Sequence, residues 1–251
     1  MTVLALGLGN SAHAVLAADE PSATPYRPTV STPANLSEPG WVELETGGQR
    51  SHGGDSLRRD SIPYTVKYAF TPDWGIRLGG DAWLRDVAPD GSKLSGFGDT
   101  AFILKRRFAL NDATAFGLEG GVNLPTAKDG LGSGKVDYLI TGIYSTNFSD
   151  YHTDINLSAT RLGQIAEDEN RWQTTWAVSL SRALGERWGV AGEFSGSYRR
   201  NVPSTAQFLA AVSYNVSKRV VFDAGAAAGL NHTSPDWSLF AGVTWLIGKI
   251  Q

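Results

Sequence analysis

Residues Ile62–Arg85 read IPYTVKYAF, then TPD, then WGIRLGGDAWLR, and they contain two alternating segments around a short turn. In both segments, bulky apolar side chains take every second position. The apolar set consists of Tyr64, Val66, Tyr68, Phe70, Trp74, Ile76, Leu78, Ala82 and Leu84. Successive side chains of a strand point to opposite faces, so the stretch predicts an antiparallel hairpin with one apolar and one charged face. Aromatic residues flank the turn, as expected where a hairpin meets a membrane–water boundary.

The same alternation recurs in twelve segments along the chain. Most segments are roughly 9 to 13 residues long, which exceeds the five or six residues of a typical globular strand and suits a tilted membrane strand. The predicted strands are Trp41–Thr46, Ile62–Phe70, Trp74–Arg85, Phe97–Phe108, Thr114–Leu124, Val136–Phe148, Tyr151–Leu162, Arg171–Leu184, Arg187–Tyr198, Thr205–Tyr214, Arg219–Leu230 and Trp237–Gly248.

Short and long connections alternate between these strands. The short ones are 71–73, 109–113, 149–150, 185–186 and 215–218, and the longer polar ones are 47–61, 86–96, 125–135, 163–170, 199–204 and 231–236. Outer-membrane barrels have short turns on the periplasmic side and longer loops outside. The pattern therefore predicts such a barrel, and an even number of strands places both termini in the periplasm.

Alternation alone does not decide which face of the sheet is outside. In a soluble sandwich or a lipocalin-like barrel, the apolar set would form the core and the charges would meet water. Here the polar faces consist mainly of Gly, Ser, Thr, Asn and single charges, which is sparse for a water-exposed surface. Aromatic residues also gather near the short turns. We therefore predict an all-β fold, a transmembrane antiparallel up-and-down β-barrel of about 12 strands in a Gram-negative outer membrane.

The composition excludes several classes of protein. The chain has 251 residues and a net charge of −3, so it offers no broad basic surface, and we expect no nucleic-acid partner. It contains no cysteine, which excludes disulfides and thiolate metal sites. No apolar run approaches the ~20 residues that a membrane helix needs.

We expect three regions in the chain. Residues 1–18 contain a short apolar run followed by small residues and are interpreted as a signal peptide, truncated at its start because a basic segment is missing. Residues 19–40 are rich in Pro, Ser and Thr and show no periodicity, which predicts a flexible leader. Residues 41–251 are predicted to form the outer-membrane barrel.

Three fragments resemble a known family. They are PGWVELE at Pro39–Glu45, GFGDTAFILKRRF at Gly96–Phe108 and GLEGGVNLPT at Gly117–Thr126. They are similar to outer-membrane transporters of the meta-pathway phenol-degradation family, over roughly residues 39–247. The family commonly has Gly after LPT, whereas this chain has Ala127. The resemblance implies passive passage of small, often aromatic, compounds.

The face opposite the apolar one carries ionisable side chains of both signs on many strands. By parity, the lumen-facing set is Glu43, Glu45, Lys67, Arg77, Asp81, Arg85, Asp99, Lys105, Glu119, Asp137, His152, Asp154, Glu193 and Asp223. A barrel of about twelve strands lies between filled eight-stranded barrels and open sixteen-stranded porins. These charges can therefore set solute selectivity in a conduit, or they can pair across the lumen as a closed, salt-bridged core.

Neither a metal site nor a catalytic site is expected. His152, Asp154 and Asn156 share an inward face, but no second His joins them by parity. A lipid hydrolase of this architecture would need Ser and His together on the lipid side near the outer rim. The four histidines are assigned to the leader, loops and lumen: His13, His52, His152 and His232. We expect no enzyme activity and no cofactor.

The sequence thus predicts an outer-membrane channel for uptake or efflux of small solutes through a polar lumen of mixed charge. The alternative is a closed structural or adhesive barrel that acts through its surface loops. Expected partners are outer-membrane lipids and lipopolysaccharide, the barrel assembly machinery and a small-molecule solute. The identity of the solute does not follow from the sequence.

Overall fold

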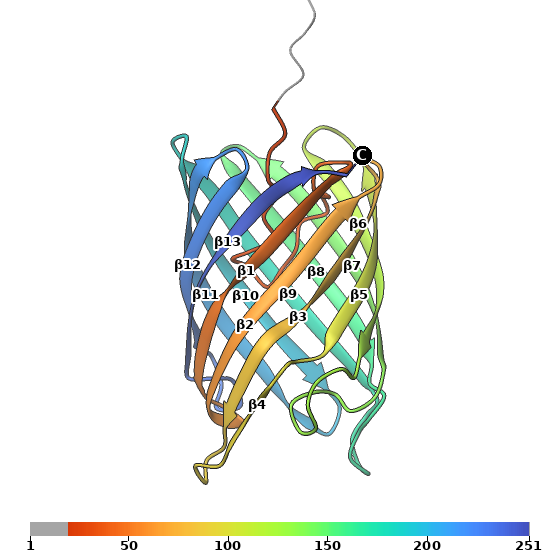
Figure 1. Cartoon of the computed structure of the whole chain (residues 1–251), viewed down its shortest axis with the longest axis vertical. Coiled ribbons are helices and arrows are strands. Elements are labelled where there is room, and N and C mark those ends of the chain that lie inside the picture. Colours follow the sequence, from red (N-terminus) through yellow and green to blue (C-terminus); the bar gives the residue numbers. More distant parts are fainter. Residues whose placement is uncertain (1–19, 251) are drawn as a thin grey trace, which may run out of the picture.

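The alternating segments pair in chain order into a closed antiparallel barrel (Figure 1). The computed structural model describes residues 20–250, so the signal peptide predicted for residues 1–18 lies outside the described part. The strands are β1 (Trp41–Gly53), β2 (Ser56–Ala69), β3 (Trp74–Val87), β4 (Lys93–Gly96), β5 (Thr100–Ala109), β6 (Thr114–Leu124), β7 (Asp137–Phe148), β8 (Tyr151–Arg161), β9 (Trp172–Leu184), β10 (Trp188–Arg199), β11 (Val202–Ser217), β12 (Val220–Gly229) and β13 (Trp237–Lys249).

Closure of the barrel comes from pairing of its first and last strands. Trp41 lies opposite Lys249 and His52 opposite Trp237, so β1 and β13 pair over their whole length. The short strand β4 pairs only with β3 and lengthens that strand's outer loop. The wall therefore contains twelve strands, which confirms the predicted fold class. Within residues 20–250, the structure contains no helix of the length and apolarity required to cross a bilayer.

Two outer connections are shorter than predicted. The expected loop at 47–61 is largely strand, because β1 continues to Gly53 and β2 begins at Ser56. Gly53 and Gly54 make the tight turn with φ of 86° and 73°, values that glycine adopts without strain. The expected loop at 199–204 likewise shrinks to Arg200 and Asn201, with Asn201 at φ 64°. Polar side chains and glycines concealed the alternation in these segments.

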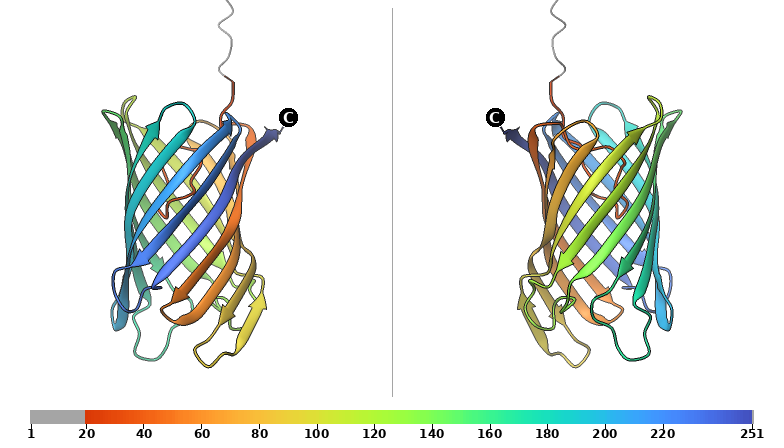
Figure 2. Two further views of the ribbon diagram at one scale, coloured as in Figure 1. Left: turned by 90° about the vertical axis from the view of Figure 1, so that its left-hand side faces the viewer. Right: turned by 90° about the vertical axis from the view of Figure 1, so that its right-hand side faces the viewer.

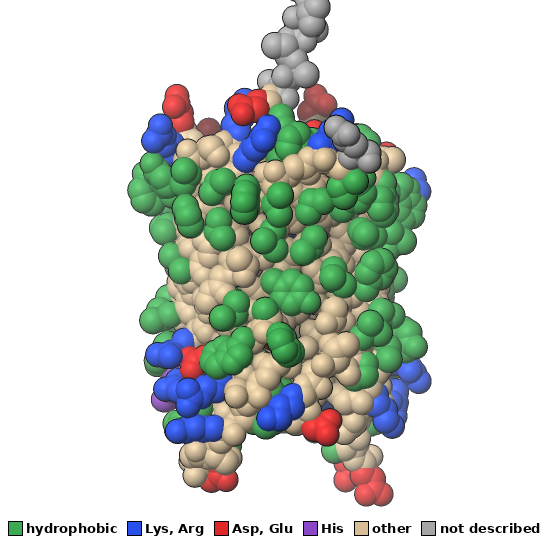
Figure 3. Space-filling model, in the orientation of Figure 1, with side chains coloured by type: hydrophobic (Ala, Val, Ile, Leu, Met, Phe, Trp, Pro, Cys, Tyr) green, Lys and Arg blue, Asp and Glu red, His purple; other side chains and the backbone are tan. Residues whose placement is uncertain are grey.

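Bulky apolar side chains cover the exterior of the barrel (Figure 3). Trp188, Phe194 and Phe222 are 52%, 52% and 51% exposed, whereas the adjacent Glu193 and Asp223 are 1% and 6% exposed. Large apolar side chains in contact with water would be unfavourable, so this surface faces lipid. Charged side chains gather instead at the two ends of the barrel. The predicted inside-out arrangement is confirmed.

A β-bulge reverses the parity of the outer half of β3. Pro63 lies opposite Asp81, but Ile62 lies opposite Trp83, so one extra residue of β3 is accommodated at Ala82. A shift of one residue sends every later side chain of a strand to the other face. Trp83 therefore lies on the exterior. Arg85, opposite Asp60, also lies there, and its predicted position in the lumen is wrong.

Residues 20–40 enter the barrel from the end that holds the C-terminus (Figures 1 and 2). The red-brown segment descends into the lumen, turns and returns to the same end, where β1 begins. We call residues 20–40 the N-terminal plug. This is the segment expected to be a flexible leader, and its contacts with the wall are specific.

Candidate channel lumen

Side chains of the barrel wall hold the tip of the plug through its backbone. Glu193 on β10 accepts hydrogen bonds from the N–H groups of Val30 (3.1 Å) and Ser31 (2.7 Å). Asn156 on β8 both accepts from the N–H of Thr32 (2.8 Å) and donates to its carbonyl oxygen (2.9 Å). Irregular backbone inside a membrane barrel needs such partners, because buried unpaired amides are costly.

An ion pair fixes the descending arm of the plug. The Arg27 guanidinium donates from Nε to Asp223 Oδ2 at 3.0 Å and from Nη2 to Asp223 Oδ1 at 2.9 Å. Only 3% of the Asp223 side chain is exposed. A bidentate arginine–carboxylate pair constrains the orientation of the guanidinium group as well as its distance from the carboxylate. Asp223 therefore positions the plug in addition to lining the lumen.

Lys67 and two glutamates form the first of two charge clusters around the plug. Lys67 Nζ lies 2.5 Å from Glu43 Oε1 and 2.5 Å from Glu45 Oε1. The same carboxylates accept from the plug, since Thr24 N–H donates to Glu43 (2.8 Å) and Tyr26 N–H donates to Glu45 (2.7 Å). The two acids therefore bind the lysine and the plug together, which compensates part of their desolvation.

Glu119 on β6 is the centre of the second cluster. It accepts from Arg77 Nη2 at 2.8 Å and lies 3.5 Å from Lys105 Nζ. Lys105 in turn donates to the Tyr26 hydroxyl (3.1 Å) and to the carbonyl oxygen of Pro33. The Tyr26 ring lies 3.8 Å from Lys67 Nζ and 4.4 Å from Lys105 Nζ, distances typical of cation–π contacts. Three acids and three bases thus neutralise one another around a single aromatic side chain.

His152 and Asp154 lie together on β8 as a hydrogen-bonded pair. His152 Nε2 lies 3.0 Å from Asp154 Oδ1, and Nδ1 lies 2.6 Å from Asn147 Oδ1. Asp154 also accepts from Ser145 Oγ, which accepts from the N–H of Ala34 in the plug. Within residues 20–250, no group of three His, Cys, Asp or Glu side chains is placed to hold a metal ion.

Three more of the predicted lumen residues lie toward the outer mouth. Asp81 is half-buried opposite Pro63. Asp137 accepts from the N–H of Gly163 (2.8 Å) in the loop after β8. Asp99 lies just before β5 and accepts from the N–H of Ser133 (2.7 Å), the N–H of Ala127 (3.1 Å) and other donors. Asp99 and Asp137 therefore fasten outer loops.

Asp99 makes the folded loop at 125–136 sensitive to pH. Partial burial raises the pKa of the Asp99 carboxyl, but hydrogen bonds from Ser133, Ala127 and Asn123 outweigh burial and leave the pKa below its usual value. A group with a lowered pKa stabilises the fold above its unfolded-state pKa, and the stabilisation is lost as the pH falls through the folded-state pKa. We expect faster proteolysis of this loop in acid.

The same loop should open at neutral pH in Asp99→Asn, because the amide loses acceptor capacity and charge. Limited proteolysis between residues 127 and 135, followed by mass spectrometry, measures the effect. Asp90→Asn in the neighbouring loop is the matched control, since Asp90 bonds only locally to Ser92. Equal cleavage of wild type and Asp99→Asn across the pH range would contradict the assignment.

Several lumen residues were missed from the sequence. Arg59 and Asp86 pair across the inner face at 3.4 Å, and the bulge concealed Asp86. Tyr26 and Arg27 belong to the plug, which lacks the periodicity used to find strands. His52, which was assigned to a loop, is not a lumen residue either: it lies on the exterior face of β1 and stacks on Trp237 with 5.7 Å between ring centroids. A lipid hydrolase would need a serine beside such a histidine, but no serine or threonine hydroxyl in residues 20–250 is hydrogen-bonded to His52.

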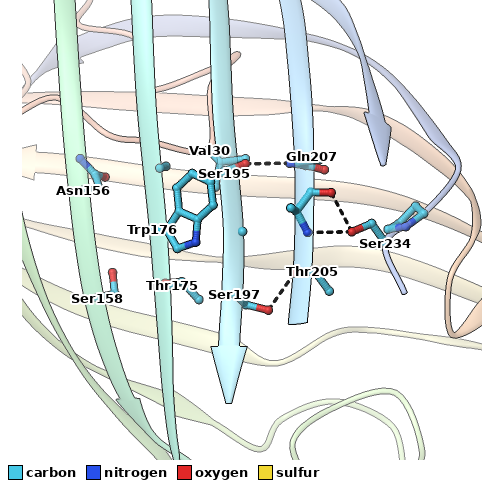
Figure 4. A pocket seen from close by; sticks show the side chains of 14 residues that line it. Val30, Asn156, Ser158, Thr175, Trp176, Ser195, Ser197, Thr205, Gln207 and Ser234 are labelled. Atoms are coloured by element: carbon cyan, nitrogen blue, oxygen red, sulfur yellow. Dashed lines mark hydrogen bonds between the residues drawn. The ribbon is translucent and has the colours of Figure 1, made fainter. Parts of the chain in front are cut away.

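The plug separates two cavities of the lumen. The outer one has a volume of about 340 Å³, and the periplasmic one about 390 Å³. Uncharged side chains line the outer cavity (Figure 4), mainly Val30, Asn156, Ser158, Thr175, Ser195, Ser197, Thr205, Gln207 and Ser234. The periplasmic cavity includes Arg27, His152 and Asp154. The lumen thus presents neutral hydroxyl groups on the loop side of the plug and charged groups on its periplasmic side.

A family model matches most of this barrel. The family described as "Putative MetA-pathway of phenol degradation" matches residues 88–247. The match agrees with the resemblance seen in the sequence. No curated protein matches the chain by sequence.

Solved outer-membrane barrels share the fold. The COG4313 outer membrane channel from Pseudomonas putida F1 superposes with a TM-score of 0.69 at 11% identity, over 85% of this chain and 98% of that one. The NanC porin gives 0.60 at 10% identity, over 82% and 100%. The CymD monoaromatic hydrocarbon channel gives 0.52 at 11% identity, over 84% and 90%. These are channels and porins rather than enzymes, and their barrel is the outer-membrane type.

Proposed function

Because the chain belongs to the family described as "Putative MetA-pathway of phenol degradation", we propose that it is a channel for small neutral solutes, aromatic ones included. The observation that supports this most is the uncharged outer cavity. Its hydroxyl and amide groups offer hydrogen bonds without a charge that would attract ions. Val30 adds an apolar contact at the tip of the plug. A cavity of about 340 Å³ accommodates a molecule the size of a substituted phenol.

Passage through this lumen requires movement of the plug. Val30 and Thr32 lie between the two cavities, and wall carboxylates and Asn156 hold the backbone there. Most of the contacts that hold the plug are hydrogen bonds and ion pairs, and water entering the lumen can replace these. The barrel wall is held by its own strand pairing and does not need the plug for closure. Transport is therefore proposed to follow displacement of residues 20–34.

Single-channel recording in planar bilayers tests this function. We expect small, intermittent conductance from the wild type, with further current interruptions when a neutral catechol-like solute is added on the loop side. Ser195→Phe should remove the interruptions, since the new ring fills the outer cavity. Gly192→Ala on the same strand is the control, because its added methyl meets only ordinary contacts with the Phe208 ring. Absence of conductance at every voltage would overturn the proposal.

The second candidate is a closed barrel that acts through its outer loops. The observation in its favour is the neutralised charge cluster around Tyr26, which resembles a packed core more than an open conduit. The two functions give different deletion results. If the protein acts through its outer loops, deletion of the gene should leave solute uptake unchanged and reduce binding at the cell surface. If it is a channel, deletion should reduce solute uptake.

A further inference from the structure

A row of charged side chains crosses the exterior of the barrel near its outer end. Leu239 on β13 lies opposite Arg50 on β1, Arg50 lies opposite Asp60 on β2, and Asp60 lies opposite Arg85 on β3. Residues directly opposite one another in antiparallel strands lie side by side on one face of the sheet. Arg58 is two positions from Asp60 on β2 and shares that face. We call Arg50, Arg58, Asp60 and Arg85 the arginine row.

The arginine row has a net positive charge, because it contains three arginines and one aspartate. Asp60 contacts two arginines, through Arg50 Nε at 2.5 Å and Arg58 Nε at 3.2 Å. Arg85 forms no ion pair with any of residues 20–250. One carboxylate therefore holds two guanidinium groups in place, and a third stands beside it. The remaining N–H groups lie at the surface, since 55% of the Arg50 side chain and 36% of the Arg58 side chain are exposed.

An apolar groove begins directly below the arginine row. Gly48 and Ile62 lie two positions from Arg50 and Asp60 along β1 and β2, on the same face and closer to the membrane centre. Gly48 lies opposite Ala241, and Ile62 lies opposite Trp83. Gly48 has no side chain, and a methyl group placed on it would meet no atom within 4 Å. The arginine row and the groove share one shallow hollow of about 620 Å³, and Trp83 and Leu239 line its apolar part. It is open to the outside of the barrel.

The arginine row and the adjoining groove face the outer leaflet of the membrane. Outer loops follow β1, so the arginine row lies at the loop end of the wall, where Lys and Arg side chains gather beyond the hydrophobic surface (Figure 3). Lipids with phosphate headgroups meet a barrel at this level, with their chains against the apolar wall. Arginine binds phosphate with two parallel hydrogen bonds, and an aromatic side chain such as Trp83 suits the interface.

We propose that the arginine row binds a phosphate of lipopolysaccharide, and that one acyl chain of the same lipid lies in the groove over Gly48. Arg50 and Arg85 flank the phosphate, and Asp60 orients Arg50 toward it. The adjoining groove favours lipopolysaccharide over free phosphate, because free phosphate gains nothing from Trp83 and Leu239. The bound lipid would steady β1, β2 and β3 at the outer rim.

The test compares lipid retention by purified full-length protein. Wild type and the double variant Arg50→Gln/Arg85→Gln are reconstituted with lipopolysaccharide, and the lipid retained after washing is measured by native mass spectrometry. We expect retention to fall on the order of tenfold, since charge-assisted hydrogen bonds to phosphate are lost. Gly48→Leu should lower retention with every charge in place, because its side chain fills the groove.

Arg106→Gln provides the matched control. Arg106 is also an exterior arginine, but it lies near the opposite end, over the rings of Trp74 and Phe108 at 4.8 Å each. Retention by this variant should equal that of wild type. Mobility on unheated gels confirms that each variant is folded.

Three results would overturn the proposal. One is equal retention by wild type and the double variant. Another is equal loss in Arg106→Gln, which would indicate a general charge effect. The third is evidence of a simple anion site, given either by displacement of the lipid by inorganic phosphate alone or by equal retention of an anionic phospholipid. None of these readouts depends on whether the lumen conducts.

Discussion

Removal of residues 20–34 is expected to raise the single-channel conductance severalfold while the barrel still assembles. The plug occupies the space between the outer and periplasmic cavities, and the hydrogen bonds of residues 20–34 go mainly to wall side chains and, from Ala23, to the Lys218 carbonyl in a turn, not to the strand ladder. Once it is removed, Lys67 keeps Glu43 and Glu45, and Arg77 keeps Glu119. Asp223 and Glu193 lose their partners in the plug, and water in the opened lumen replaces those partners. Recording in planar bilayers measures the change.

Point variants separate displacement of the plug from damage to the barrel. Arg27→Gln and Asp223→Asn each break one ion pair, and each should lengthen the open intervals. Because they remove the same interaction, the double variant should add little to either single one. Unchanged conductance on deletion, in protein that migrates as folded on unheated gels, would show that residues 20–34 do not block the lumen.

Phe194→Arg is expected to prevent assembly of most of the protein. Phe194 lies midway along β10, is 52% exposed on the lipid side and contacts Phe208 with 4.9 Å between ring centroids. An arginine at the bilayer midplane costs about 2–4 kcal/mol in a barrel of this type, and the aromatic pair is lost as well. The folded fraction on unheated gels and urea unfolding in lipid vesicles measure the effect.

The neighbouring position supplies the control for Phe194→Arg. Ser195 points into the lumen and accepts a hydrogen bond from Gln207 at 3.1 Å. Ser195→Ala should assemble like wild type, since lumen positions face water rather than lipid. If both variants assembled equally well, the exterior of β10 would not be in contact with lipid.

The fold and its orientation could be predicted because both depend on a local, repeated signal. Alternation with period two identifies strand faces residue by residue, as in Phe194 and Glu193, which lie on opposite sides of the wall. Errors arose where that signal was interrupted. One bulge at Ala82 moved Arg85 from the lumen to the exterior, and no feature of the stretch GGDAWLR shows the insertion.

The candidate site was only partly predictable. The wall residues Glu43, Lys67, Glu119 and Glu193 lie on the inner face as parity required. Their partners could not be found in the same way, because residues 20–40 have no periodicity and several of their hydrogen bonds reach side chains more than a hundred residues away. Val30 and Glu193 are separated by 163 positions.

The sequence by itself determined that twelve long alternating strands form a barrel with an apolar exterior, since the pleat of a strand fixes the side on which each residue lies. Only the tertiary structure decided that residues 20–40 enter the lumen between two cavities and that Arg85 joins Arg50 and Asp60 outside. Both outcomes depend on which strands become neighbours and where a bulge shifts their register. Those relations exist only after the barrel closes.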